Sequence, residues 1–203
     1  MDTFTKLTAA SAHLDLLFAD ATARLVGAVR DRHSAIHAPV VVTGDGDARI
    51  MVLRAADDDL ALLRFHTDLR SPKVATLAAD PRLTVLAYDP GARVQLRLNG
   101  IAHVETNGVH ADAAWAAAST LSRRCYLAQV GPSAPMDAAG SALPPELRDN
   151  RLTHAQSEAG RENFAVIMMR AECLDWLQLS HDGGLRARFE RSSEGWQGAW
   201  VAP

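Results

Sequence analysis

Cysteine and long apolar runs are both scarce in this chain of 203 residues. Its 2 cysteines, Cys125 and Cys173, lie far apart and form no Cys-x-x-Cys motif, so we predict reduced, structural thiols. His33 and His37 are four positions apart, but Pro39 follows closely and no carboxylate is paired with them. We therefore expect no metal site. No apolar stretch reaches the roughly 20 residues that a membrane-spanning helix requires.

An excess of charge of either sign is also lacking. The chain has 21 lysines and arginines against 24 aspartates and glutamates, which gives a formal net charge of −3. This balance argues against a nucleic-acid partner and against a polybasic membrane anchor. The first residues lack the charged and apolar regions of a signal peptide. Together these absences predict a cytoplasmic protein.

Residues 11–30 carry the clearest helical pattern. The apolar side chains that recur at helical spacing are Leu14, Leu17, Phe18, Ala21, Leu25 and Ala28. Charged residues fall largely off this stripe. We expect the helix to cover one face or one mouth of a sheet.

Most of the remaining chain reads as short extended runs between turn signals. The predicted strands cover residues 35–43, 48–54, 60–67, 82–88, 93–104, 163–170, 172–179, 185–191 and 196–201. The cleanest alternation of apolar and polar side chains lies in residues 93–99. Strands in series with short turns favour an antiparallel barrel or sandwich. With 48% hydrophobic residues, the chain can bury a full core, and we expect a single domain over residues 1–203.

Two segments break this pattern. Residues 109–118 are alanine-rich and predict a helix on which Trp115 packs against the sheet. Residues 131–162 are rich in Gly, Pro, Ala and Ser, and predict a long loop with at most a short helix at residues 145–148. Loops of this length in compact domains are often functional, so we interpret this one as a flap or an oligomer arm.

The stretch from Ser71 predicts an anion site. Ser71 suits the N-cap of a helix and Pro72 its first position, and Pro81 requires the helix to end near Asp80. Free backbone N–H groups and the positive end of the helix dipole favour an anion there. Lys73 in the first turn is unfavourable for the helix itself but favourable beside a phosphate. An ordinary capped surface helix is the alternative.

Motifs in this order resemble those of the pyridoxamine 5'-phosphate oxidase-like FMN-binding split-barrel family. They are Arg49-Ile-Met-Val-Leu-Arg54, Phe65-His-Thr-Asp-Leu-Arg-Ser-Pro-Lys73, Gln95-Leu-Arg-Leu-Asn-Gly100, Asp175-Trp176 and Arg186-Ala-Arg-Phe189. The resemblance covers roughly residues 35–104 and 163–203. It implies a mainly β fold with flanking helices, an antiparallel split β-barrel, and FMN bound at the interface of a homodimer.

The same resemblance implies which residues bind the cofactor. They are Arg49, Ile50, Met51, Val52, Leu53, Arg54, His66, Thr67, Ser71, Pro72, Lys73, Gln95, Trp176 and Arg186, with Arg188 as an alternative to Arg186. Arg49, Ser71 and Lys73 match positions that hold the phosphate, and cationic donors suit a phosphate physically. Members that oxidise pyridoxamine phosphate carry an Arg-Leu-His triplet where this chain has Asp182-Gly183-Gly184. They also carry a tyrosine, an arginine and a serine at four-residue steps, a motif that is not found around Arg123 and Arg124.

We therefore expect an FMN-dependent oxidoreductase that acts on a small molecule and has lost the pyridoxamine-phosphate clamp. No residue stands out as an obligatory catalytic acid or base, because the flavin supplies the redox chemistry in such sites. Two alternatives are a non-catalytic FMN- or nucleotide-binding module and a true pyridoxamine or pyridoxine 5'-phosphate oxidase with a rearranged clamp. A third is a structural dimer that has lost its ligand.

Overall fold

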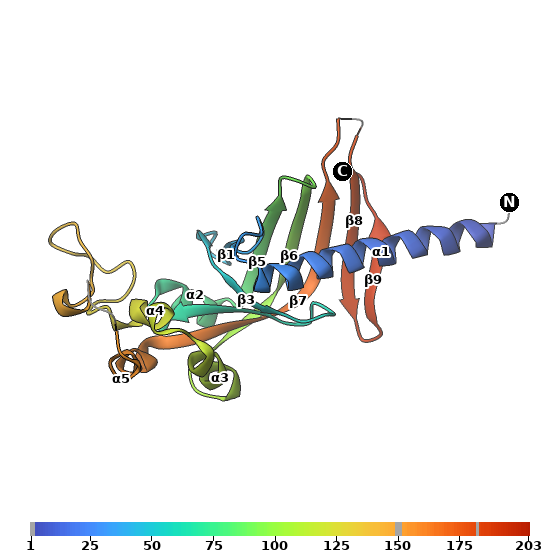
Figure 1. Cartoon of the computed structure of the whole chain (residues 1–203). Helices are drawn as coiled ribbons and strands as arrows, with labels where there is room; N and C mark the ends of the chain where they lie inside the picture. The colour runs from blue at the N-terminus through green and yellow to red at the C-terminus, as the bar shows by residue number, and fades with distance from the viewer. Residues whose placement is uncertain (1–2, 149–151, 182) are drawn as a thin grey trace.

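The computed structural model describes residues 3–148, 152–181 and 183–203, with side chains from residue 13 onward. The helices are α1 (Thr3–Arg30), α2 (Pro72–Ala79), α3 (Val109–Ala117), α4 (Thr120–Arg123) and α5 (His154–Glu158), with 3-10 turns η1 (Arg124–Leu127), η2 (Pro145–Leu147) and η3 (Ala159–Asn163). The strands are β1 (Val40–Thr43), β2 (Ala48–Ile50), β3 (Leu53–Ala56), β4 (Leu63–Asp68), β5 (Arg82–Asp89), β6 (Val94–Glu105), β7 (Phe164–Gln178), β8 (Leu185–Ser192) and β9 (Gly195–Trp200). Figure 1 shows their arrangement.

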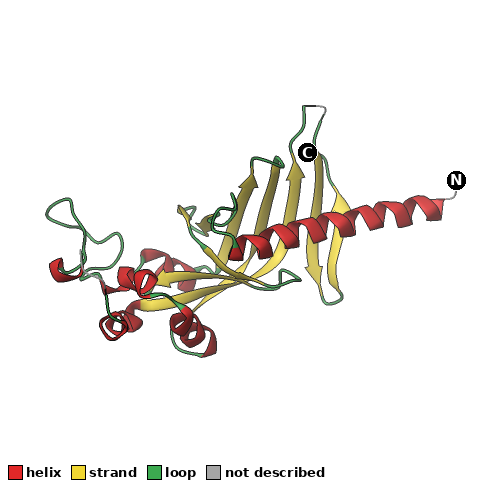
Figure 2. Ribbon diagram, in the orientation of Figure 1, coloured by secondary structure: helices red, strands yellow, loops and turns green. Residues whose placement is uncertain are grey.

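The strands form one antiparallel sheet that curls on itself (Figure 2). Its order is β2-β1-β5-β6-β7-β4-β3, with β8 and β9 continuing from β7. β2 ends at Ile50 and β3 begins at Leu53, yet the two strands lie at opposite ends of this order. Because a few residues span only a short distance, the sheet must curl until its two edges approach each other. The predicted antiparallel split barrel with flanking helices is confirmed.

The prediction of one continuous strand over residues 48–54 is therefore wrong. Ala48–Ile50 pairs with β1, whereas Leu53–Ala56 pairs with β4. Between them, the N–H of Met51 donates to the carbonyl of Pro39. Local residue pattern does not reveal this change of partner, because both halves are extended.

Strand β7 is also longer than predicted, since residues 163–170 and 172–179 form one strand rather than two. Its first part pairs with β4, its last part pairs with β8, and β6 lies beside both parts. A β-bulge at Asn99 and Gly100 accommodates the irregularity. A Cβ atom on Gly100 would lie 2.0 Å from the carbonyl oxygen of Arg170, so only glycine fits at this position.

Helix α1 begins at Thr3, earlier than predicted, and ends at Arg30 as expected. Ala21, Leu25 and Ala28 of the predicted stripe are buried against the inner face of the sheet. Figure 1 shows the helix crossing the strands, with its N-terminal part extending past the edge of the sheet. No helix within the described ranges is long and apolar enough to span a membrane.

The remaining helices gather at the opposite end of the sheet from the N-terminus (Figure 1). Trp115 of α3 packs on Phe164 of β7, with ring centroids 5.2 Å apart, as predicted for this tryptophan. The expected short helix at residues 145–148 is η2, but α5 and η3 were not predicted. The sequence does contain a signal for α5, because Thr153 and Gln156 form a capping box.

Candidate functional site

A cavity of about 330 Å³ lies where the link between β2 and β3, the end of β4 and the start of α2 meet. Most of the predicted cofactor residues line it: Arg49, Ile50, Met51, Val52, Arg54, His66, Thr67, Ser71 and Lys73. Two other predicted residues lie close by in the chain. Pro72 is the first residue of α2, whereas Leu53 is fully buried in the core and faces away from solvent. We call this cavity the β2–α2 pocket.

The start of α2 has the geometry that the sequence predicted. Ser71 is the N-cap, Pro72 is the first helical residue and Asp80 is the C-cap. The hydroxyl of Ser71 makes no capping hydrogen bond to the helix, and instead accepts one from the ammonium of Lys73. Ser71 is buried at 4% exposure. Pro72 has no N–H, and the N–H of Val74 donates to the carbonyl of Ser71, so the first turn offers the backbone N–H of Lys73 without a side-chain cap on it.

Two cations face this helix start. Arg49 donates to the hydroxyl of Thr43 at 3.1 Å and pairs with Asp47 at the edge of the pocket. The pKa of Lys73 is lowered, first by burial and then by the positive charge of Arg49. Two like charges held together in a half-buried site repel each other, and a bound anion relieves that repulsion. The β2–α2 pocket is therefore suited to a phosphate.

His66 forms another wall of the pocket. Its ring packs edge-on against Phe164, with centroids 5.0 Å apart. Burial lowers the pKa of His66 to about 3, with further contributions from the positive charges of Arg54 and Arg64. The imidazole is therefore neutral near pH 7, and its buried Nε2 has no hydrogen-bond partner among the described residues.

The lowered pKa of His66 predicts a loss of stability in acid. Below pH 6.5 the unfolded chain takes up a proton at this histidine, whereas the folded chain does not until about pH 3. The free energy of unfolding should therefore fall as the pH drops, by at most about 2 kcal/mol between pH 6.5 and pH 5. Urea unfolding at the two pH values should show a smaller loss for His66→Gln. An equal loss in both proteins would assign the effect to another group.

Gln95 and Arg186 lie elsewhere, on the outer face of the sheet. Gln95 of β6 is opposite Leu177 of β7, which is opposite Arg186 of β8, so the three side chains form one row. Tyr88 of β5 continues this row and is 43% exposed. Within one chain, neither Gln95 nor Arg186 lines the β2–α2 pocket.

Arg186 is held in place by a buried carboxylate. Its Nη2 lies 2.7 Å from Oδ2 of Asp175, and Arg97 donates to the same oxygen at 2.9 Å. Burial raises the pKa of Asp175, but the hydrogen bonds and charges of Arg186 and Arg97 outweigh it, so the pKa lies below its usual value. The cluster places fixed guanidinium groups on the outer face. Arg188 also lies on this face, where it pairs with Glu190.

Trp176 lies on the opposite face from Gln95 and Arg186. Its neighbours across the strands are Leu96 and Ala187, both buried, and its own exposure is 4%. The indole N–H donates to Asp20 of α1 at 2.9 Å. Because the ring is part of the core under α1, we leave Trp176 out of the proposed ligand contacts.

Residues that the sequence did not single out also line the β2–α2 pocket: Asp68, Cys125, Tyr126 and Pro132. Cys125 and Tyr126 come from η1, which reaches the pocket through tertiary packing that no local motif announces. Asp68 is paired with Arg70, whose guanidinium also donates to the carbonyl of Ala128 at 2.8 Å. That pair joins the end of β4 to the segment after η1.

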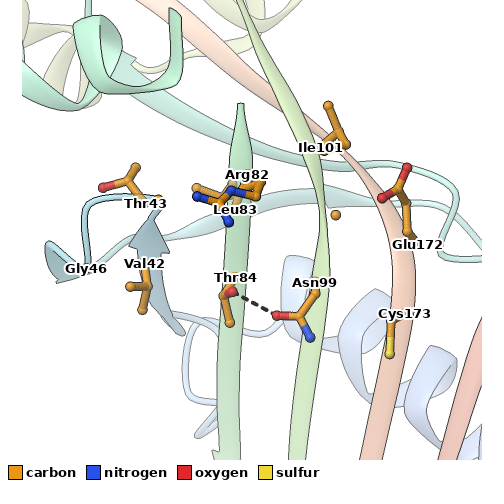
Figure 3. Close-up of a pocket in the computed structure, with 12 residues that line it drawn as sticks. Val42, Thr43, Gly46, Arg82, Leu83, Thr84, Asn99, Ile101, Glu172 and Cys173 are labelled. Carbon is orange, nitrogen blue, oxygen red and sulfur yellow. Dashed lines mark hydrogen bonds between the residues drawn. The ribbon is translucent and has the colours of Figure 1, made fainter. Parts of the chain in front are cut away.

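A second, open groove of about 490 Å³ lies on the outer face (Figure 3). Thr84 and Asn99 meet there across β5 and β6 with a hydrogen bond of 2.8 Å, and Glu172 and Cys173 of β7 lie beside them. None of the predicted cofactor residues lines this groove.

A scan of the chain against models of known protein families agrees with the resemblance that the sequence motifs indicated. Residues 31–106 match the model of a family described as pyridoxamine 5'-phosphate oxidase, FMN-binding domain. This match confirms the resemblance that the sequence motifs indicated. The domain family with which these residues align is an FMN-binding one. No curated protein sequence matches the chain.

Solved structures share the fold. A pyridoxamine 5'-phosphate oxidase-related, FMN-binding protein from Nostoc punctiforme is 22% identical with a TM-score of 0.66, and the match covers 91% of this chain and 96% of that one. PhzG from Burkholderia lata, solved in complex with tetrahydrophenazine-1-carboxylic acid, is 18% identical with a TM-score of 0.63, over 100% of this chain and 93% of that one. At these identities the likeness shows the split-barrel fold, and the chemistry has to be argued from this chain's own residues.

Proposed function

We propose that this protein binds FMN in the β2–α2 pocket and is an FMN-dependent oxidoreductase for a small molecule. The observation that carries the proposal is that two cations, Lys73 and Arg49, lie together at the start of α2, where the helix has no side-chain cap. A phosphate monoester near neutral pH carries close to two negative charges and three acceptor oxygens. Charge-assisted hydrogen bonds from the Lys73 and Arg49 side chains, together with the backbone N–H of Lys73 at the helix start, match that group.

The remainder of the pocket suits a ring. Met51, Val52 and Pro132 provide apolar surface, and neutral His66 and buried Thr67 provide polar atoms beside it. When bound, FMN would supply two-electron chemistry, taking a hydride equivalent from the substrate and passing the electrons to an acceptor such as dioxygen. The protein's part is to hold the phosphate, orient the ring and exclude water.

We further propose that the functional unit is a homodimer. Gln95 and Arg186 can contact a cofactor in the β2–α2 pocket only if they come from a second copy, because within one chain they lie on another surface. Their row on the outer face includes the exposed ring of Tyr88 and the fixed guanidinium of Arg186, as expected of a subunit interface. Light scattering should give twice the 21.8 kDa chain mass. A monomer that still binds FMN tightly would contradict the shared site.

We also propose that residues 1–203 form a single domain in the cytoplasm. Strands from both ends of the sequence join one sheet, since β7 pairs with β4 and β6 as well as with β8. Pairing of this kind leaves no natural boundary inside the sheet. Limited proteolysis that released two stable fragments, each with a separate unfolding transition, would contradict the single domain.

The hairpin between β7 and β8 supports the loss of the pyridoxamine-phosphate clamp. Asp182 lies outside the described residues, but Gly183 has φ +108° and Gly184 has φ +27°. A Cβ atom on Gly184 would lie 2.6 Å from the carbonyl oxygen of Gln178. Leucine and histidine at positions 183 and 184 would be strained in this backbone, so we propose a substrate other than pyridoxamine or pyridoxine phosphate.

The test is to load the purified protein with FMN and add candidate reductants and substrates. Bleaching of the flavin absorbance by a substrate, followed by recovery in air, would support the oxidoreductase. An FMN-bound protein that no substrate reduces would favour a non-catalytic FMN-binding module. Formation of pyridoxal phosphate with kcat/KM above ~10⁴ M⁻¹s⁻¹, within the ordinary range of enzymes, would contradict the lost clamp.

A further inference from the structure

One wall of the β2–α2 pocket comes from a distant part of the sequence. Pro132 lines the pocket, whereas most of the other lining residues lie between residues 49 and 73. Pro132 belongs to residues 128–134, which follow η1 and include no helix or strand. We call these residues the 128–134 segment. Because it has no secondary structure of its own, the segment keeps its position beside the pocket through contacts with the rest of the molecule.

Arg70 ties this segment to the end of β4. Nε and Nη2 of its guanidinium donate to the two carboxylate oxygens of Asp68, at 3.0 Å and 2.7 Å. Nη1 of the same group donates to the carbonyl of Ala128 at 2.8 Å. The Asp68 side chain is only 8% exposed, so this two-point pair is sheltered from solvent and fixes the plane of the guanidinium. One side chain therefore joins the end of a strand to the start of the 128–134 segment.

Close packing beside Arg70 provides a second, independent contact. A Cβ atom on Gly131 would lie 2.7 Å from Cβ of Arg70 and 3.3 Å from the carbonyl oxygen of the same arginine. The backbone of the segment thus passes against Arg70 at a distance that glycine allows and a larger residue does not. Gly131 directly precedes Pro132, so this approach also determines where the proline ring lies.

The other hydrogen bonds of the segment do not attach it to the sheet. The N–H of Gln129 donates to the carbonyl of Ala142 at 2.9 Å, and the N–H of Ala134 donates to the carbonyl of Gly131 at 3.2 Å. Both bonds lie within the loop itself and determine its shape. In the described ranges, the hydrogen bond that joins the segment to the end of β4 is the one from Arg70. The position of the segment therefore depends on Arg70 and on the close packing beside it.

We propose that Arg70 is a positioning residue that holds the 128–134 segment against the flavin ring and so slows the release of the cofactor. The inference rests on the proposed function, because it takes FMN as the ligand of the β2–α2 pocket. Among the described residues, Arg70 is not part of the pocket lining, and it acts through Pro132, which is. Contacts that form once a ligand is seated act mainly on its rate of dissociation, so Arg70 should affect koff rather than kon.

The test needs variants that release the segment without a change of charge. Asp68 also lines the pocket, so a neutral residue at position 70 would leave an unpaired carboxylate there. Arg70→Lys keeps a cation beside Asp68 but lacks the planar fork that reaches Asp68 and Ala128 together. Gly131→Ala adds a Cβ atom that collides with Arg70. Gly140→Ala is the matched control in the same loop, because a Cβ atom there meets nothing within 4 Å.

Stopped-flow fluorescence gives kon and koff for FMN and for riboflavin, and hydrogen–deuterium exchange of the cofactor-free protein shows how firmly the segment is held. In Arg70→Lys and Gly131→Ala, koff should rise about tenfold, the factor expected when a charge-assisted hydrogen bond is lost, while kon stays the same. The factor should be equal for FMN and riboflavin, because the segment contacts the ring rather than the phosphate. Exchange should be faster in the segment and unchanged in β6. Gly140→Ala should behave as the unchanged protein does.

Unchanged exchange in the segment of both variants would overturn the proposal, because Arg70 would then not hold it. Faster exchange with an unchanged koff would also overturn it, since the segment would not contact the cofactor. A larger rise in koff for FMN than for riboflavin would assign the effect to the phosphate instead. The proposed function fails separately: faster exchange in a protein that binds neither flavin would retain the attachment by Arg70 and remove the cofactor.

Discussion

Replacing Lys73 with alanine should weaken FMN binding by about 1.5–3 kcal/mol, or roughly ten- to a hundredfold in Kd. The variant removes an ammonium group that lies beside Arg49 and the first turn of α2, where the phosphate is proposed to bind. Riboflavin has the same ring but no phosphate, so its affinity should change much less. Quenching of flavin fluorescence on titration measures both constants.

Arg82→Ala is the matched control for this variant. Arg82 follows the other end of the same helix, its side chain is 73% exposed, and it pairs with Asp80. The substitution therefore removes a cation that does not line the pocket. Its Kd for FMN should equal that of the unchanged protein. Equal losses of FMN and riboflavin affinity in Lys73→Ala would show that Lys73 acts on the ring or on folding rather than on the phosphate.

Replacing Arg123 with methionine should destabilise the protein by on the order of 3 kcal/mol. Arg123 is 1% exposed and donates to the carbonyl of Trp115 through Nε at 3.1 Å and Nη2 at 2.6 Å. Its guanidinium also pairs with Glu158 and stacks 4.6 Å from the Trp115 ring centroid. Methionine fills part of the volume but leaves the buried carbonyl without its donors.

Urea unfolding followed by circular dichroism measures this loss, and Arg124→Met is the control. Arg124 neighbours Arg123 in the chain but forms no ion pair among the described residues, so its replacement should cost less than about 1 kcal/mol. Similar losses in the two variants would mean that the network around Trp115 is not what stabilises this end of the molecule. Because Arg123 is buried and its guanidinium already has partners, we do not expect it to contact a substrate.

Local signals predicted those parts of the fold that depend on neighbouring residues. Ser71 and Pro72 indicated the start of α2, and alternation indicated β6, because capping and side-chain orientation are decided within a few residues. The exchange of strand partner between Ile50 and Leu53 could not be predicted, since it depends on which distant strand each half meets. For the same reason, the join of two predicted strands into β7 was missed.

The candidate site shows the same division. Residues 49–54 and 66–73 are close in sequence, and most of them line one pocket as the motifs indicated. The alternation of Trp176 with Asp175 assigns its side chain to the opposite face and hence to the core. The proposed contacts of Gln95 and Arg186 with a second copy cannot be predicted from local patterns in one chain.

Protection of Cys125 by FMN is the most direct test of the proposed site. This thiol lines the β2–α2 pocket, and burial raises its pKa, so alkylation is best followed at a fixed alkaline pH. The chain has 2 cysteines, so in the Cys173→Ser variant Cys125 is the one thiol that can react. FMN should slow the alkylation of Cys125 saturably, and riboflavin should need a higher concentration to do so. A rate of alkylation that stays the same at saturating FMN would show that the cofactor does not occupy this pocket.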